Sequence, residues 1–181
     1  PVVADQEAAH AGFRAVEFAF AYEYRISEVV AAQQEHRLEV VLINAPAGNW
    51  AAGDRGLASV PGREHEFAAS IANALQYAQA LRCPRIHVMA GLLPDQADDA
   101  ERERRIRTYV RNLRFACSEA AAQSVTITIE PINPRDFPGY LLNTQAMVWR
   151  TGLELDREAK RLASVTRLSV WRKLLTGRLW P

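Results

Sequence analysis

The sequence predicts an α/β protein with a parallel sheet, in which about four strands alternate with helices. Two observations support this fold class. Four short segments rich in β-branched and apolar residues are separated by longer segments with apolar residues at helical spacing. The links between each helix and the following strand are also short. Repetition of one strand–helix unit favours part of a (β/α) barrel over a doubly wound sheet, although periodicity alone does not decide between them.

The first strand is predicted at residues 15–20, after a short helix that ends at Gly12. Its valine and phenylalanine side chains share one face, so Glu17 lies on the opposite face between two alanines. Two interpretations of Glu17 stay open. It lies either in a crowded, partly polar interior or on the exposed face of an edge strand.

Residues 28–37 are predicted to be helical, with Ser27 as the N-cap. The near-continuous apolar run over residues 38–44 is typical of a strand buried on both faces, and it ends at Asn44. A long glycine-rich loop follows, and loops after strands carry binding groups more often than cores do. The polar and aromatic side chains of this loop are Trp50, Asp54 and Arg55.

A helix is predicted to begin after Pro61 and to end near Leu81. The next strand, over residues 85–91, is closed by glycine and places His87 on the face opposite its aliphatic neighbours. A single histidine on a strand is usually a structural residue. It would contact a ligand or substrate if its face is the interior of a barrel.

The longest helix is predicted over residues 97–124, and a strand over residues 125–130 follows it. In that strand Glu130 shares a face with two threonines, and Pro131 ends the strand because proline cannot donate to a ladder. A carboxylate therefore stands at the carboxyl end of a strand, where parallel α/β folds usually place their chemistry. The alternative is a solvated glutamate at a strand end.

Composition excludes several classes of function. The net charge of +1 predicts neither nucleic acid nor an anionic membrane as a partner. No apolar run is long enough to cross a bilayer, and no glycine-rich phosphate-binding motif follows a strand. Cys83 and Cys117 are predicted to be unpaired in a reducing compartment, so we expect a cytoplasmic protein. The chain begins at Pro1 without a methionine, which indicates a processed or incomplete N-terminus.

The character of the sequence changes after Asn143, because residues 145–181 are rich in arginine and lysine and show no further strand–helix alternation. We therefore predict a partial barrel domain over residues 1–146 and an atypical basic tail over residues 147–181. The tail is expected to be helical through Leu162. The last part of the tail has two interpretations. It is either an amphipathic basic segment that binds a membrane or a partner, or a poorly packing tail that is not the natural continuation of the barrel sequence. We favour the second. The apolar residues of that segment are Leu168, Trp171, Leu174 and Leu175.

Several blocks of this sequence resemble the hydroxypyruvate isomerase family, which belongs to the xylose-isomerase-like (β/α)8 TIM barrels. The resemblance covers about residues 8–146. The most specific block is Glu-Pro-Ile-Asn-Pro-Arg-Asp-Phe-Pro-Gly-Tyr, which begins at Glu130. The others are Ala-Gly-Phe-Arg-Ala-Val-Glu-Phe from Ala11, Asn44 with Gly-Asp-Arg-Gly from Gly53, Pro-Gly-Arg from Pro61, His-Val-Met-Ala-Gly from His87, and Leu-Asn-Thr from Leu142.

The resemblance implies interconversion of hydroxypyruvate and tartronate semialdehyde through an enediol. It implies Glu130 as the proton donor and acceptor, with a small hydroxy-keto acid as substrate. It also places Asn44, His87 and Glu17 as substrate contacts or supports. In the wider superfamily a divalent metal, Mg²⁺ or Mn²⁺, holds the developing oxyanion, and Glu130 would be one of its ligands.

The resemblance ends near Ala146. The family's later strands, with the remaining metal ligands and the second catalytic glutamate, have no counterpart, and its first strand is missing before Pro1. About half of the eight strands of a closed barrel are therefore predicted. A frame shift near Ala146 is the most economical explanation, and a genuine short paralogue is the alternative.

Three functions fit these observations. The first is the isomerase. The second is a non-catalytic partial barrel that pairs with itself, or with a complementary chain, through exposed strand edges. A metal-dependent phosphoesterase of the endonuclease IV type ranks last, because only His87 of the four histidines stands at a strand position.

Overall fold

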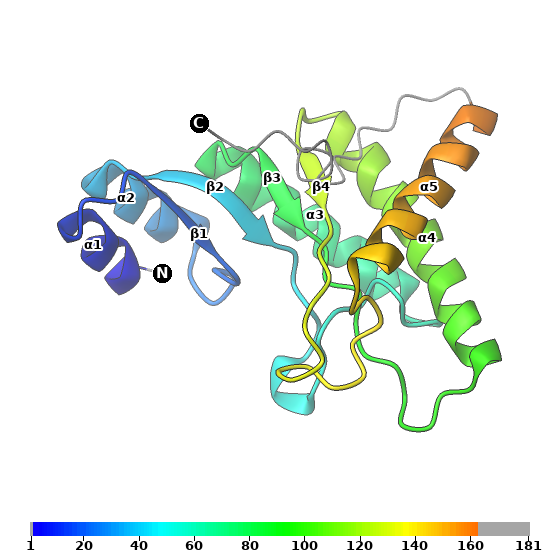
Figure 1. Cartoon of the computed structure of the whole chain (residues 1–181). Coiled ribbons are helices and arrows are strands. Elements are labelled where there is room, and N and C mark those ends of the chain that lie inside the picture. The colour runs from blue at the N-terminus through cyan, green and yellow to red at the C-terminus, as the bar shows by residue number, and fades with distance from the viewer. Residues whose placement is uncertain (1, 163–181) are drawn as a thin grey trace, which may run out of the picture.

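The computed structural model describes residues 2–162 and has four strands, five α-helices and one short 3-10 helix in that part of the chain (Figure 1). In chain order these elements are α1 (Val2–His10), β1 (Ala15–Phe18), α2 (Ile26–His36), β2 (Glu39–Asn44), η1 (Trp50–Ala52), α3 (Glu64–Leu81), β3 (Arg85–His87), α4 (Asp99–Ala121), β4 (Thr126–Thr128) and α5 (Gln145–Leu162).

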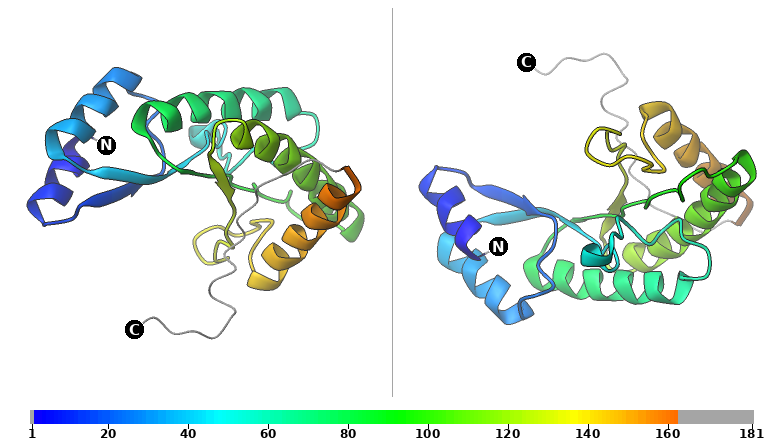
Figure 2. Two further views of the ribbon diagram at one scale, coloured as in Figure 1. Left: turned by 90° about the horizontal axis from the view of Figure 1, so that it is seen from above. Right: turned by 90° about the horizontal axis from the view of Figure 1, so that it is seen from below.

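The four strands form one parallel sheet in the order β1-β2-β3-β4. Figure 2 shows α2, α3 and α4 along one face of the curved sheet, as right-handed β–α–β crossovers require. The predicted architecture of about four parallel strands with intervening helices is confirmed. Among the described residues β1 and β4 are the edge strands, so each has one side without a strand partner.

The core lies between the sheet and the helices. The central side chains of β2, β3 and β4 on this side are Ile43, Ile86 and Ile127, which are all almost completely buried. α3 and α4 pack on them with aliphatic and aromatic side chains at helical spacing. This layer fixes which face of each strand is apolar, so the intervening side chains must point to the opposite face.

The strands are shorter than the sequence predicts. β3 ends at His87 and β4 at Thr128, although the predicted segments continue to residues 91 and 130. Residues 88–91 and Ile129 stay buried, whereas Glu130 is exposed. The chain after β3 bonds to β4 and to the loop that follows β4, for example Leu141 N to the carbonyl oxygen of Gly91 at 3.0 Å. Alternation of hydrophobic residues indicates which side chains are buried, but it does not show where the hydrogen bonds between neighbouring strands end.

The prediction that Ser27 caps the second helix is wrong. α2 begins at Ile26, and its N-cap residue is Arg25. The backbone amide of Arg25 donates to the carboxylate of Glu28 at 2.8 Å. Glu28, the third residue of the helix, therefore provides a hydrogen-bond acceptor for the N-cap amide.

The predicted helix before Leu162 is confirmed as α5, which packs on α4. Val148 and Leu155 of α5 are buried in the same core as the sheet. The division of the chain at residue 147 remains a prediction, and the predicted amphipathic segment at 168–175 lies outside the described residues. None of the helices between residues 2 and 162 is both long and apolar enough to span a membrane.

Candidate active site

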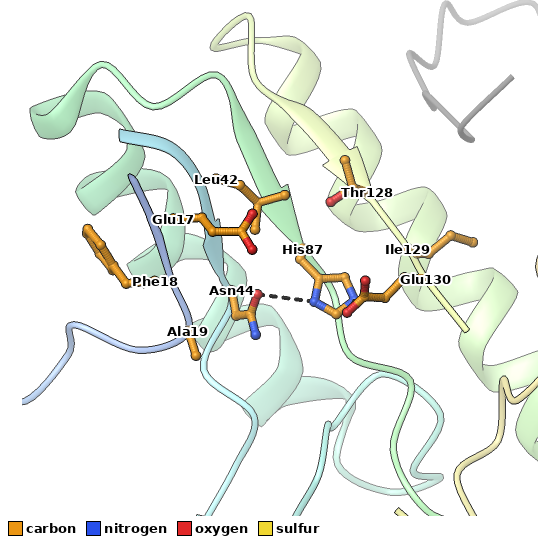
Figure 3. A pocket seen from close by; sticks show the side chains of 9 residues that line it. All are labelled: Glu17, Phe18, Ala19, Leu42, Asn44, His87, Thr128, Ile129 and Glu130. Atoms are coloured by element: carbon orange, nitrogen blue, oxygen red, sulfur yellow. Dashed lines mark hydrogen bonds and ion pairs between the residues drawn. The ribbon is translucent and has the colours of Figure 1, made fainter. Parts of the chain in front are cut away.

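Polar side chains from all four strands meet on the face of the sheet that the helices leave open. They line a hollow of about 470 Å³ at the carboxyl ends of the strands. Figure 3 shows the side chains of Glu17, Asn44, His87, Thr128 and Glu130 turned toward one another. The structure therefore brings together all four site residues that the sequence analysis names, and it adds Thr128.

Backbone register explains why these side chains meet. Asn44 of β2 pairs with His87 of β3, and His87 pairs with Thr128 of β4. Partners in adjacent strands point to the same face of a sheet. Glu17 is on β1, and its neighbours Val16 and Phe18 pack against the core on the other face. Its side chain is exposed at the edge of the hollow, as expected for an edge strand.

Asn44 fixes the tautomer of His87. Nδ1 of His87 lies 3.1 Å from Oδ1 of Asn44. An amide oxygen has no hydrogen to donate, so Nδ1 must carry the proton in this bond. The other ring nitrogen, Nε2, is consequently an acceptor. Nε2 is buried and makes no hydrogen bond to any described residue.

Nε2 of His87 faces the carboxylate of Glu130. The distance from Nε2 to Oε1 of Glu130 is 3.8 Å. Burial lowers the pKa of His87 to about 4, so the imidazole is neutral near pH 7 and this contact is not an ion pair there. Both groups are hydrogen-bond acceptors, so each needs a donor, and at 3.8 Å apart they leave no space for an atom on the line between them. A substrate hydroxyl would supply such a donor.

Glu130 lies two residues beyond β4, and its side chain is 58% exposed. Partial burial, and secondarily the nearby Glu17 carboxylate, raise the pKa of Glu130 above its ordinary value. A carboxyl group whose pKa is shifted toward neutrality, placed at the wall of a cavity, is suited to accept and return a proton.

Residues outside the hollow hold Asn44 in place. The hydroxyl of Tyr22 donates to the carbonyl oxygen of Asn44. The ring of Tyr22 in turn packs edge-on against Tyr77 of α3, with 4.9 Å between the ring centroids. Tyr22 could not be predicted from the sequence, because nothing in the residues around it shows that a loop tyrosine bonds to the backbone of a strand end.

The loops after the strands pack closely against one another. A Cβ atom on Gly56 would lie 2.4 Å from the carbonyl oxygen of Met89, and one on Gly91 would lie 2.6 Å from that of Gly56. Tyr140 connects the loop after β4 to the loop after β3, since its hydroxyl accepts a hydrogen bond from the amide of Ala90 at 2.8 Å. The loops after β2, β3 and β4 therefore form one packed unit.

The described residues do not by themselves form a metal centre. No group of three or more His, Cys, Asp or Glu side chains in residues 2–162 is arranged to hold a metal ion. Nε2 of His87 and the carboxylate of Glu130 are chemically suitable donors, but they are only two. A divalent metal therefore stays a prediction for this chain.

Fold and site together define half of a parallel β/α barrel, with a carboxylate and an imidazole at the carboxyl ends of its strands. The sequence profile of the xylose isomerase-like TIM barrel family matches residues 6–162. The chain belongs to this family.

Curated relatives include isomerases of small keto acids. The chain is 54% identical over 138 residues to a 2-oxo-tetronate isomerase of Cupriavidus necator, covering 76% of this chain and 52% of the relative. It is 42% identical over 137 residues to the hydroxypyruvate isomerase of Escherichia coli, covering 76% and 52%. The chain thus spans about half the length of the curated relatives it matches.

Solved structures agree on the fold. A protein of Brucella melitensis described as an AP endonuclease of family 2 has a TM-score of 0.75 and 37% sequence identity, covering 83% of this chain and 58% of the other. A D-psicose 3-epimerase of Clostridium cellulolyticum has a TM-score of 0.64 at 18% identity, covering 86% of this chain and 54% of the other. At that identity the second likeness concerns the fold alone.

Proposed function

We propose that this chain carries the proton-transfer half of a 2-oxo acid isomerase, with hydroxypyruvate and tartronate semialdehyde as the interconverting pair and Glu130 as the proton donor and acceptor. The named relatives support the reaction class, because they are isomerases of 2-oxo acids that carry hydroxyl groups. The single observation that carries the proposal is the position of Glu130. Its pKa is raised, and it lies 3.8 Å from an unpartnered acceptor nitrogen of His87.

The reaction moves one hydrogen between neighbouring carbons. Glu130 removes a proton from C3 of hydroxypyruvate, and the electrons of that C–H bond form the enediol double bond while O2 becomes anionic. Glu130 then returns the proton to C2, and the proton of the O3 hydroxyl passes to the O2 anion as the C3 carbonyl forms. The net change is a 1,2-hydrogen shift with no external oxidant.

The remaining groups orient the substrate. Nε2 of His87 accepts a hydrogen bond from the O3 hydroxyl, which places C3 next to Glu130. The amide nitrogen of Asn44 donates to no described residue, so it is free to donate to the developing oxyanion. Glu17, at the far wall, contacts a hydroxyl group or supports the charge state of Glu130.

The direct test is conversion of hydroxypyruvate by the purified chain beside a Glu130→Gln variant, with Mn²⁺ or Mg²⁺ and then with chelator. General acid–base catalysis contributes about 10²–10⁴-fold, so we expect the variant to lose activity by at least about 100-fold. A Glu35→Gln variant on the exposed side of α2 is the matched control and should keep full activity. Equal turnover by wild type and Glu130→Gln would refute the role of Glu130, and loss of turnover with chelator would support the metal.

The phosphoesterase alternative has less support. One similar solved structure is described as an AP endonuclease of family 2. The charged side chains that line the hollow in this chain are the carboxylates Glu17 and Glu130, and no lysine or arginine of the described residues lines it. A nucleic-acid backbone carries one negative charge per phosphate, many more than a single 2-oxo acid, and its binding needs several cationic side chains that this lining does not supply.

A further inference from the structure

A second cavity lies outside the hollow, where the loop after β2, the loop after β3 and α4 meet. It has a volume of about 210 Å³ and shares no lining residue with the hollow. This is smaller than the pockets that hold drug-sized ligands, so it suits a ligand of a few heavy atoms. One part of its lining is charged and another part is apolar. The side chains of these two parts are Asp54, Arg55, Arg63 and Arg105, and Val60, Leu92, Leu93 and Pro94.

Two of the three arginines in this lining have counter-ions within the protein. Arg63 donates to both oxygens of Asp54, at 2.8 and 2.9 Å, and it is also paired with Glu66. The hydrogen bonds from Arg63 are the main cause that lowers the pKa of Asp54, so this carboxyl group is ionised near pH 7. Arg105 is paired with Glu101 at 2.9 Å. The charges of Arg63 and Arg105 are therefore offset without a ligand.

The third arginine, Arg55, forms no ion pair in the described part of the chain, but its orientation is fixed. Its guanidinium carbon lies 3.9 Å from the ring centroid of Trp50 and 5.7 Å from that of Phe137. Its Nη1 donates to the carbonyl oxygens of Trp50, at 3.1 Å, and Asp54, at 2.7 Å. A side chain that is held in this way loses little conformational freedom when a ligand binds to it.

The guanidinium group of Arg55 has one edge that is open to a ligand. Its Nε and Nη2 donate to no residue in the described range 2–162, whereas Nη1 is used by the two carbonyl groups. Nε and Nη2 lie side by side on a planar group, so they form a fork that matches the two oxygens of a carboxylate. Since Arg55 lines the second cavity, these are the donors that a ligand in that cavity would find.

Charge and lining together indicate the class of ligand. One cation of the cavity lacks a counter-ion, so a single negative charge balances it, while a second would be repelled by the carboxylate of Asp54. The apolar part of the lining would cover a short hydrocarbon chain.

We propose that the second cavity binds a small organic monocarboxylate. Its carboxylate accepts hydrogen bonds from Nε and Nη2 of Arg55, and its hydrocarbon part packs on Leu92 and Leu93. The ligand thereby connects the loop after β2 to the loop after β3. This site is distinct from the hollow that contains Glu130, and the inference does not rest on the proposed function.

Titration with butyrate at constant ionic strength, followed by ligand-observed NMR, tests this inference. The wild type should bind butyrate saturably. Arg55→Gln should weaken the binding roughly 10- to 100-fold, because it removes a charge-assisted bidentate contact. Arg55→Lys should be intermediate, since lysine keeps the charge and loses the fork. Butyramide has the same shape without the charge, and it should bind the wild type at least about tenfold more weakly than butyrate.

Inorganic phosphate tests whether any small anion suffices. It has no hydrocarbon part, and its second charge would face Asp54, so it should bind the wild type more weakly than butyrate. Phosphate binding as tight as that of butyrate would overturn the assignment to an organic monocarboxylate.

Two control variants should keep the wild-type Kd for butyrate. Arg107→Gln removes an exposed cation on α4 that is paired with Glu103, and Glu130→Gln removes a charge from the hollow. Circular dichroism checks that each variant is folded. The inference would be overturned by a wild type that binds no butyrate, by equal Kd values in wild type and both Arg55 variants, or by weaker binding in Glu130→Gln, which would place the carboxylate in the hollow. Arg55-dependent binding by a chain without turnover would uphold the inference and refute only the proposed function.

Discussion

At the scale of single residues, the Asn44–His87 hydrogen bond decides what the site can do. It directs the only ring proton of the imidazole away from Glu130 and leaves an acceptor facing it. The site therefore offers one neutral acceptor and one carboxylate to the substrate. That pairing suits a hydroxyl group next to the carbon that exchanges its proton.

The burial of His87 also makes stability depend on pH. The pKa of His87 is about 4 in the folded chain and near 6.5 in an unfolded chain. The unfolded chain thus takes up a proton first as the pH falls. The stability contributed by the neutral imidazole is fully present above about pH 6.5 and is lost progressively down to about pH 4, by at most roughly 3 kcal/mol.

Urea unfolding at pH 7 and pH 4.5 measures this loss, with a His87→Gln variant as the comparison. We expect the free energy of unfolding of the wild type to fall more steeply between these two pH values than that of the variant. The exposed His65 provides the control, and a His65→Gln variant should follow the wild type. Parallel pH dependence in wild type and His87→Gln would contradict the burial argument.

Much of the site could be predicted from single positions in the sequence. Alternation along strands places Glu17, His87 and Glu130 on the non-apolar face, and carboxyl ends of parallel strands meet at one edge of a sheet. Thr128 obeys the same alternation, but a threonine on a strand gives no sign of its own that it lines a site. The tautomer of His87 and its unpartnered nitrogen depend on a distance between strands, which no local pattern contains.

At the scale of elements, the loops after the strands are tied together by backbone contacts that only glycine permits. Gly56 has a φ of 127°, and its α-carbon faces the backbone of Met89 and Gly91. This contact joins the loop that carries Arg55 to the strand end that carries His87. The sequence shows a glycine-rich loop there, but it does not show which glycine touches a neighbouring loop.

Substituting this glycine should separate the two loops. We expect Gly56→Ala to lower the free energy of unfolding by about 3 kcal/mol or more, because left-handed strain of about 1–3 kcal/mol adds to a clash with fixed backbone atoms. Gly62→Ala is the matched control, since Gly62 also has a positive φ of 84° but faces open space. It should cost only about 1 kcal/mol. An equal loss of unfolding free energy in Gly56→Ala and Gly62→Ala, measured by thermal or urea unfolding, would show that the contact between the two loops is not tight.

At the scale of the whole molecule, the described sheet has two unpaired edges and an open polar face. β1 and β4 each present backbone groups on one side without a strand partner. Such edges favour pairing with a further strand. The sequence predicts this openness, because about four strand–helix units can be identified in it and a closed barrel needs eight strands.

We expect the purified chain to associate with itself through these edges. Light scattering after size exclusion should give a mass above the 20.2 kDa of one chain, rising with protein concentration. In the β1–β2 ladder Arg14 and Val16 bond to β2, so the backbone amide of Ala15 faces the free edge. An Ala15→Pro variant removes that donor, and it should reduce the association. A single species of monomeric mass at all concentrations would contradict self-pairing and favour a complementary partner chain.

The central claim is that Glu130 exchanges a proton with the substrate carbon, and hydrogen exchange in D₂O tests it most directly. Proton NMR follows loss of the C3 signal of hydroxypyruvate with wild type, with Glu130→Gln and without protein. We predict that the wild type accelerates the exchange and that Glu130→Gln lowers this acceleration by about 10²–10⁴-fold, toward the rate without protein. Exchange as fast with Glu130→Gln as with the wild type would contradict the account.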